Sequence, residues 1–207
     1  MINRFLSSFV TAFFVMFSAA ALAAEPENTL VIEVAGSNEG TIEIELFPDL
    51  APNHVARIKI LARDGVYNNV AFHRVIEGFM AQTGDVKHGQ VDGYLPRYAG
   101  QGGSNYPNIA AEFSDYAYAE GVVGMARSSS PDSANSQFFI MNNQPDAEKA
   151  SRISDALTGE YTVFGRVISG QDVVNSIKLG QQDLNGAVLE NPDYMAKVYV
   201  KSDATDG

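Results

Sequence analysis

Residues 72–85 read Phe72-His73-Arg74-Val75-Ile76-Glu77-Gly78-Phe79-Met80-Ala81-Gln82-Thr83-Gly84-Asp85. The pattern predicts a strand over residues 71–76 and, after the break at Gly78, a second short extended piece over residues 79–83. Successive side chains of a strand point to opposite faces. Arg74 is therefore expected to face away from His73, and Met80 is expected to share a face with Gln82.

Two further motifs follow in the chain. They are Gly124-Met125-Ala126 with Ser136-Gln137-Phe138-Phe139-Ile140, and Tyr161-Thr162-Val163-Phe164-Gly165-Arg166-Val167. By the same alternation Gln137 and Phe139 share a face, and Phe138 lies on the other. One aromatic ring is thus expected in the core and the other at a surface site. An arginine and two glutamines among apolar neighbours suit a concave binding surface.

The rest of the chain reads as short elements joined by turns. Strands are expected at 29–35, 41–47, 122–126, 136–141, 161–167 and 197–201, with a long ordered loop over 84–115. One helix is expected from Pro52 to Gly65, and a second between Ser169 and Gly180. Many short strands with two helices suggest a closed antiparallel barrel with plugged ends, although periodicity alone leaves sandwich and barrel undecided.

The three motifs, in this order, resemble the cyclophilin family over about residues 29–200. The resemblance implies a β-dominated fold, a closed eight-stranded antiparallel β-barrel capped by two α-helices. It also implies peptidyl-prolyl cis-trans isomerase activity, with no metal and no cofactor. The catalytic residue that it implies is Arg74. The substrate-binding residues that it implies are Phe79, Met80, Gln82, Ala126, Arg127, Gln137, Phe139, Leu157 and Tyr161.

The chemistry of proline isomerisation suits these residue types. Rotation about an X-Pro bond has a barrier of ~18–20 kcal/mol, because amide resonance is lost. In the twisted transition state the nitrogen lone pair becomes free to accept a hydrogen bond, which the guanidinium of Arg74 could donate. That contact is stronger in the transition state than in the ground state, as catalysis requires. An apolar pocket further penalises the more polar planar amide.

Other interpretations exist for single residues. Arg74 alone could be a surface ion-pair residue, and the apolar site residues could be plain core. His73 is expected to be a structural histidine with its hydrogen bonds satisfied. Asp85, His88 and Asp92 fit no specific metal-ligand spacing. The serines at 128–130 lack a partnered histidine, which argues against a serine nucleophile.

The composition restricts the compartment and the partners. The formal net charge is -11 and no basic run occurs, so nucleic-acid binding is not expected. The chain has no cysteine, which excludes disulfides and thiolate metal sites. Residues 1–23 have the charge, apolar run and small-residue end of a cleavable signal peptide, with cleavage after Ala23 or Ala24. A membrane anchor is the alternative, but the apolar run is shorter than the ~20 residues of a membrane span.

We therefore expect residues 24–207 to form one monomeric domain in the periplasm, with no membrane contact in the mature form. Full secretion remains an alternative. Its substrates would be proline-containing segments of exported or unfolded proteins. A chaperone module that binds proline peptides without turnover is the main rival function, and a carbohydrate-binding barrel is a weaker one. Residues 143–155 are expected to form a long charged connection. Ala156 stands where many members have tryptophan, which predicts weak cyclosporin sensitivity.

Overall fold

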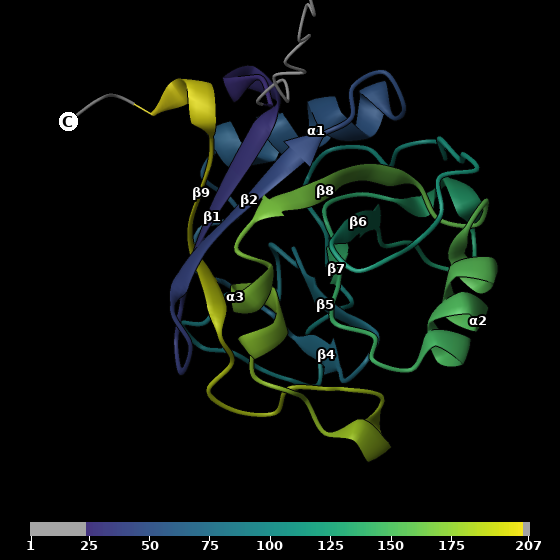
Figure 1. Cartoon of the computed structure of the whole chain (residues 1–207). Helices are drawn as coiled ribbons and strands as arrows, with labels where there is room; N and C mark the ends of the chain where they lie inside the picture. The colour runs from purple at the N-terminus through teal and green to yellow at the C-terminus, as the bar shows by residue number, and fades with distance from the viewer. Residues whose placement is uncertain (1–23, 205–207) are drawn as a thin grey trace, which may run out of the picture.

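The structure is a computed structural model that describes residues 24–204. The proposed signal peptide, residues 1–23, lies outside this range. One sheet of nine antiparallel strands curls through the molecule (Figure 1) in the order β3-β9-β1-β2-β8-β6-β7-β5-β4. The strands are β1 (Thr29–Ala35), β2 (Gly40–Leu46), β3 (Val70–Ala71), β4 (Arg74–Ile76), β5 (Met80–Thr83), β6 (Val122–Met125), β7 (Phe138–Met141), β8 (Val163–Ser169) and β9 (Tyr194–Val200).

The β-dominated fold is thus confirmed, but the count of eight strands is wrong. The stretch expected as one strand at 71–76 is divided, because β3 pairs with β9 whereas β4 pairs with β5. These two end strands are joined along the chain by Phe72 and His73, and no ladder between them occurs in residues 24–204. The sheet is therefore curled, and closure into a barrel is not confirmed.

The outer edge of β4 is covered by the loop after residue 179. The amide of Val75 donates to the carbonyl oxygen of Gly186 at 2.8 Å, and the amide of Gly180 donates to the Val75 carbonyl oxygen at 3.1 Å. Further along, the amide of Val188 donates to the His73 carbonyl oxygen at 3.0 Å. Without this loop β4 would present unpaired backbone groups.

Three α-helices are present among the described residues, one more than the sequence predicted: α1 (Pro52–Arg63), α2 (Ala147–Leu157) and α3 (Gln171–Ser176). The helix α2 occupies the segment expected to be a charged connection. Asp146 caps it by accepting a hydrogen bond from the amide of Lys149 at 3.0 Å, and Ile153 and Leu157 pack inward. The sequence therefore contained a helix N-cap, but the apolar pattern of the helix extends over only two inward residues. Helix α3 begins later than expected, because Ser169 is the last residue of β8.

Helix α1 begins at Pro52, where the missing amide hydrogen costs nothing. Its N-cap, Ala51, cannot bond the free amides of the first turn. Glu112, from the long loop, does so instead: its carboxylate accepts from the amides of Asn53 at 3.1 Å and His54 at 3.0 Å. The buried ring of His54 adds a contact of 2.6 Å between Nδ1 and the same carboxylate. The loop is thereby fixed to the helix.

The main core lies on the inner face of the curled sheet. Val75, Ala81, Ile140 and Val123 are cross-strand partners on β4, β5, β7 and β6, and all four are buried. Helix α1 adds Val55, Ile58 and Leu61 to this core, and α3 adds Val174. Each fully buried side chain of this size stabilises the fold by roughly 1.5–3 kcal/mol. None of the helices described between residues 24 and 204 has the length and apolar composition of a membrane span.

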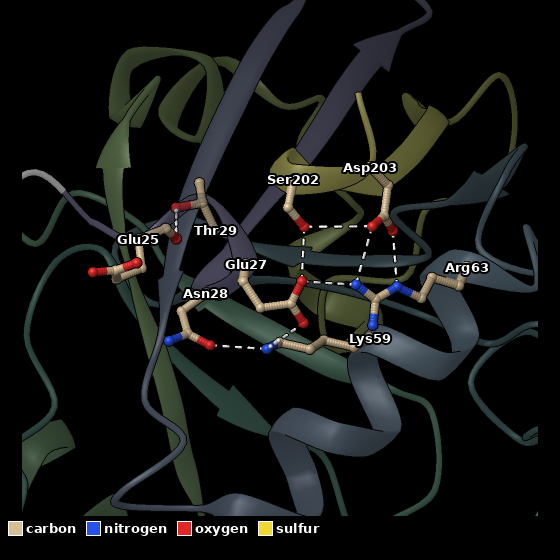
Figure 2. A network of polar contacts seen from close by, with 8 residues as sticks. All are labelled: Glu25, Glu27, Asn28, Thr29, Lys59, Arg63, Ser202 and Asp203. Carbon is tan, nitrogen blue, oxygen red and sulfur yellow. Dashed lines mark hydrogen bonds and ion pairs between the residues drawn. The ribbon is translucent and has the colours of Figure 1, made fainter. Parts of the chain in front are cut away.

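A polar network joins the two ends of the described chain to α1 (Figure 2). The carboxylate of Glu27 accepts from Lys59 at 3.1 Å and from Arg63 at 2.8 Å. Arg63 also donates to both carboxylate oxygens of Asp203, and Ser202 donates to Glu27. Hydrogen bonds from Ser202 and Lys59, followed by that from Arg63, lower the pKa of Glu27 to about 2. The network holds the chain ends at one side of the sheet.

Candidate active site

The predicted site residues of the central strands lie in one row across the sheet. Arg74 on β4 is the cross-strand partner of Gln82 on β5, which is in turn the partner of Phe139 on β7. Phe139 pairs with Gly124 on β6. Directly opposed side chains share a face of the sheet. Arg74, Gln82 and Phe139 therefore share one face of the sheet, on the side away from the main core.

Gly124 completes this row, a position for which the sequence predicted no role in the site. A Cβ atom at this position would lie 2.5 Å from Cζ of Phe139 and would also overlap the hydroxyl of Tyr118. The Phe139 ring stacks at 5.7 Å on the ring of Tyr118 and meets that of Tyr161 edge-on at 5.8 Å. The glycine thus leaves the space in which this aromatic group packs.

The apolar site residues gather in a second hydrophobic cluster, separate from the main core. Met80, Phe139 and Leu157 are its buried members among the predicted residues, and Phe79, Ala126 and Tyr161 are partly buried against it. Phe138, in contrast, belongs to the main core. The prediction that the two rings lie on opposite faces, with Phe138 in the main core, is confirmed. Leu157 reaches the cluster as the last residue of α2.

The guanidinium of Arg74 is half-buried and held by two residues. Its Nη1 donates to Oε1 of Gln82 at 3.1 Å. Its Nε and Nη2 donate to the backbone carbonyl oxygen of Asn185 at 3.0 Å and to its Oδ1 at 2.9 Å. Burial lowers the pKa of Arg74 below its ordinary value, but a guanidinium remains charged in proteins. No carboxylate within the described residues forms an ion pair with it, so the surface ion-pair interpretation is not supported.

A directed chain of amide hydrogen bonds continues from Arg74. Nε2 of Gln82 donates to Oε1 of Gln137 at 3.0 Å, and Nε2 of Gln137 donates to the carbonyl oxygens of Gly100 at 3.0 Å and Gly102 at 2.8 Å. Because each amide group donates at one end and accepts at the other, the orientation of both glutamines is fixed. The amide of Gln82 therefore cannot flip its oxygen away from Arg74 without also breaking its bond to Gln137.

The buried carboxylate of Asp85 holds the far end of this chain. Its Oδ2 accepts from the amides of Gly100 at 2.7 Å and Gly102 at 2.9 Å, and its Oδ1 accepts from those of Lys87 and His88. These four contacts use the lone pairs that a metal ion would need. Within residues 24–204 no group of three or more metal-ligating side chains is found.

A cavity of about 440 Å³ adjoins the row. Gln82, Ala126, Arg127 and Gln137 are the predicted site residues that line it. Its other walls are mostly backbone, hydroxyl and amide groups: Gly100, Gln101, Gly102, Gly103, Ser104, Asn108, Ser128, Ser133 and Asn135. The cavity is therefore polar, while the apolar cluster forms the neighbouring surface. Such an arrangement suits a peptide with one apolar residue and polar neighbours.

Arg127 is held at one side of the cavity. Its Nε donates to the carbonyl oxygen of Glu160 at 2.8 Å, and its Nη2 forms an ion pair with the Glu160 carboxylate at 3.1 Å. Its guanidinium lies over the Tyr161 ring at 4.6 Å, a cation–π distance. Arg127 and Tyr161 thus form one unit beside the Phe139 ring.

His73 lies behind Arg74, on the other face, and is 5% exposed. Burial lowers its pKa to about 4, so the ring is neutral at pH 7. The prediction that it is buried is confirmed. Within residues 24–204 no hydrogen-bond partner meets the distance and angle of a good bond to either ring nitrogen, although Ala71 and Gln137 lie near the ring.

Asn185 is a further residue at the site that no sequence motif indicated. It contacts Arg74 across 111 residues of chain. It lies in an exposed loop whose apolar residues follow no regular spacing. No motif in the sequence therefore links it to Arg74.

The polar cavity and the apolar cluster beside it suit a protein that binds extended peptides through hydrogen bonds and apolar contact. Comparison with known proteins gives the particular family. The family model of the cyclophilin type peptidyl-prolyl cis-trans isomerases matches residues 29–200. The chain belongs to this family, and it is a peptidyl-prolyl cis-trans isomerase that acts on proline-containing peptides.

Relatives support the assignment. The chain is 50% identical over 202 residues to a probable peptidyl-prolyl cis-trans isomerase of Brucella suis, covering 95% of this chain and 96% of the relative. It is 36% identical over 143 residues to peptidyl-prolyl cis-trans isomerase B of Escherichia coli, covering 69% and 80% of the two chains. A crystal structure of a cyclophilin from Hirschia baltica is similar, with a TM-score of 0.66, 27% identity, and coverage of 88% of this chain and 77% of that one.

Proposed function

We propose that Arg74 is the catalytic group of this isomerase and that it donates a hydrogen bond to the proline nitrogen as the X-Pro bond turns. The observation that carries the proposal is the state of its guanidinium. A guanidinium has five N–H donors. Three of them are used by Gln82 and Asn185, which leaves two without a partner among the described residues. Arg74 is thus a half-buried charge beside an apolar cluster, and its two free N–H groups can donate to a hydrogen-bond acceptor of the substrate.

The proposed acceptor appears only during rotation. In the planar amide the nitrogen lone pair is delocalised and accepts hydrogen bonds poorly, whereas in the twisted form it is localised. Arg74 therefore stabilises the transition state more than the bound peptide. Because Gln82 and Asn185 already hold the guanidinium, little of this stabilisation is lost to ordering the side chain.

The remaining predicted residues bind the peptide in this proposal. In this proposal the proline ring lies against the cluster that contains Phe79, Met80, Phe139 and Leu157, with partly exposed Phe79 at its surface and the three buried residues providing an environment of low polarity behind it. Gln82, Gln137, Ala126 and Arg127 hold the flanking residues at the polar cavity, and Tyr161 supports Phe139. A hundred-thousandfold acceleration corresponds to ~7 kcal/mol, whereas one charged hydrogen bond supplies ~1.5–3 kcal/mol. Apolar contact and peptide binding must provide the rest.

The test compares two arginines of the same chain. Arg74→Ala is expected to lower turnover of an Ala-Pro peptide about ten- to a hundredfold in an NMR exchange assay, with a folded spectrum. Arg166→Ala is the matched control, since Arg166 is an exposed β8 residue that pairs with Glu45 at 2.9 Å. Full turnover by Arg74→Ala would refute the catalytic role of Arg74. Binding of proline segments with no turnover by the wild type would favour the rival function, a module that only holds them.

We also propose that the mature protein is one monomeric domain of residues 24–207 in the periplasm, where exported and unfolded chains are its substrates. The sequence of residues 1–23, with its positive charge, apolar run and small-residue end, supports this part. Cell fractionation and N-terminal sequencing test it. A mature chain that begins at Ala24 or Glu25 in the periplasmic fraction is expected, and an uncleaved chain in the cytoplasm would refute it.

A further inference from the structure

We propose that Asn185 is a positioning residue for catalysis, which holds the Arg74 guanidinium by one edge so that the opposite end faces the substrate. This inference rests on the proposed role of Arg74. Two oxygens of this one residue bind the arginine: the backbone carbonyl oxygen takes Nε at 3.0 Å, and Oδ1 takes Nη2 at 2.9 Å. No other residue within the described chain gives Arg74 two contacts.

The geometry of a guanidinium explains why this pair of contacts matters. The N–H of Nε and one N–H of Nη2 are parallel and form the side edge of the planar group. Asn185 occupies this whole edge. Gln82 takes one N–H of Nη1 from another direction. The second N–H groups of Nη1 and Nη2 remain, and the plane in which they point is fixed by three bonds.

The backbone of Asn185 is suited to this role. It has φ 55° and ψ 35°, the left-handed conformation that asparagine tolerates better than most residues. It directly follows the short 3-10 helix η3 (Gln182–Leu184), the yellow-green turn below β4 in Figure 1. In this conformation the carbonyl oxygen and the side-chain oxygen of one residue reach the same edge of the arginine. Neither oxygen has another hydrogen-bond donor within residues 24–204.

The loop that carries Asn185 is fixed to the strand that carries Arg74. Arg74 and Ala187 form a β-bridge, and the Val75 backbone bonds Gly186 and Gly180. The fit is close: a Cβ atom on Gly186 would lie 2.9 Å from the Val75 carbonyl oxygen, and one on Gly180 would overlap the Gly186 carbonyl oxygen. Position 185 therefore cannot shift along β4 without breaking these contacts. Strand β4 with Arg74 and the loop with Asn185 are therefore held rigidly against each other.

The alternative is that Asn185 is an exposed turn residue whose contact with Arg74 has no effect on turnover. Asn185→Gly separates the two. Glycine keeps the backbone carbonyl contact and adopts positive φ without strain, so only the Oδ1 contact is lost. Asn191→Gly is the matched control, because Asn191 is also exposed, also has positive φ (46°), and makes no side-chain contact with Arg74. Each variant is made in the wild-type and in the Arg74→Ala background.

If Asn185 positions Arg74, Asn185→Gly lowers kcat about three- to tenfold with KM nearly unchanged, since the lost contact acts on the transition state. Its melting temperature stays at or above that of the wild type, and rotation about the Arg74 Nε–Cζ bond, measured by NMR, becomes faster. Asn191→Gly retains wild-type turnover. In the Arg74→Ala background Asn185→Gly has no further effect.

Two results would overturn the inference while leaving the proposed function intact. One is wild-type kcat in Asn185→Gly when Arg74→Ala is inactive. The other is an equal loss with and without Arg74, which would assign Asn185 an effect that does not pass through the arginine. Failure of the proposed function is a different result, namely an active Arg74→Ala variant. Even if Asn185→Gly alters the melting temperature, comparing its effect on turnover in the wild-type and Arg74→Ala backgrounds still shows whether Asn185 acts through Arg74.

Discussion

Replacing Gln82 by glutamate puts a carboxylate against the Arg74 guanidinium without changing the size of the side chain. The wild-type Oε1 lies 3.1 Å from Nη1, so the glutamate would form an ion pair with the arginine. The same change removes the donor that Gln82 gives to Oε1 of Gln137 at 3.0 Å. Gln137 cannot turn to compensate, because its Nε2 is bonded to two carbonyl oxygens.

The size of the effect follows from the charges. Two unit charges at ~4 Å interact by about 4 kcal/mol at the effective dielectric constant of ~20 that suits partly exposed sites. Arg74 is half-buried, and side-chain exposure reduces this gross figure to a net value of about 1–2 kcal/mol. The added ion pair stabilises the free enzyme and the bound peptide more than the transition state, because in the transition state the arginine must also donate a hydrogen bond to the proline nitrogen. The expected loss in kcat/KM is therefore about tenfold.

Gln82→Met is the control, since it has a similar volume, removes both hydrogen bonds and adds no charge. We expect it to lower kcat/KM about three- to fivefold, corresponding to roughly 1 kcal/mol. Both variants are assayed by NMR exchange on an Ala-Pro peptide at pH 7, and their melting temperatures are compared. The reasoning is refuted if Gln82→Glu is as active as Gln82→Met, because the added charge would then have no effect on the arginine.

Three other predictions concern stability. Because burial lowers the pKa of His73 from 6.5 to about 4, the unfolded state binds a proton that the folded state does not, and stability falls as pH drops through this range. Between pH 7 and pH 4.5 the free energy of unfolding of His73→Gln should therefore fall by roughly 2–3 kcal/mol less than that of the wild type, as measured by urea unfolding. Equal falls in the two proteins would contradict this. Gly124→Ala should destabilise the fold by about 1–3 kcal/mol and also lower turnover, since its Cβ meets the Phe139 ring; an unchanged melting temperature would argue against the close contact. Glu27→Gln should slightly lower the melting temperature at pH 7 in low salt. Its folded pKa of about 2 lies below the ordinary 4.5, so its contribution exists above pH 4.5, is lost as pH falls toward 2, and is screened by salt; a difference that persists in ~1 M salt would contradict the ionic explanation.

Local alternation was enough to predict much of the site. The two-residue period places Arg74 and Gln82 on the face opposite Val75 and Ala81, whatever the order of the strands. The same rule divided Phe138 from Phe139 correctly. These conclusions depend only on backbone geometry within one strand, which neighbouring residues specify.

Helix α2 is an element that the local sequence pattern did not predict. Asp146 is an ordinary N-cap, but the helix has only two inward apolar side chains in its last two turns, Ile153 and Leu157. A period so short does not distinguish a helix from a charged loop. Packing against Phe139 and its neighbours supplies the missing stabilisation, and that packing exists only in the folded chain.

Only the tertiary structure decided the contacts between distant segments. The division of residues 70–76 into β3 and β4 depends on two different partner strands. The first turn of α1 is capped by Glu112, more than fifty residues away, and Arg74 is held by Asn185, 111 residues away. A residue's own sequence neighbours restrict its conformation and its face, but they do not specify which distant loop will lie against it. That choice follows from how the whole chain packs, and it determines the direction in which the arginine presents its free N–H groups.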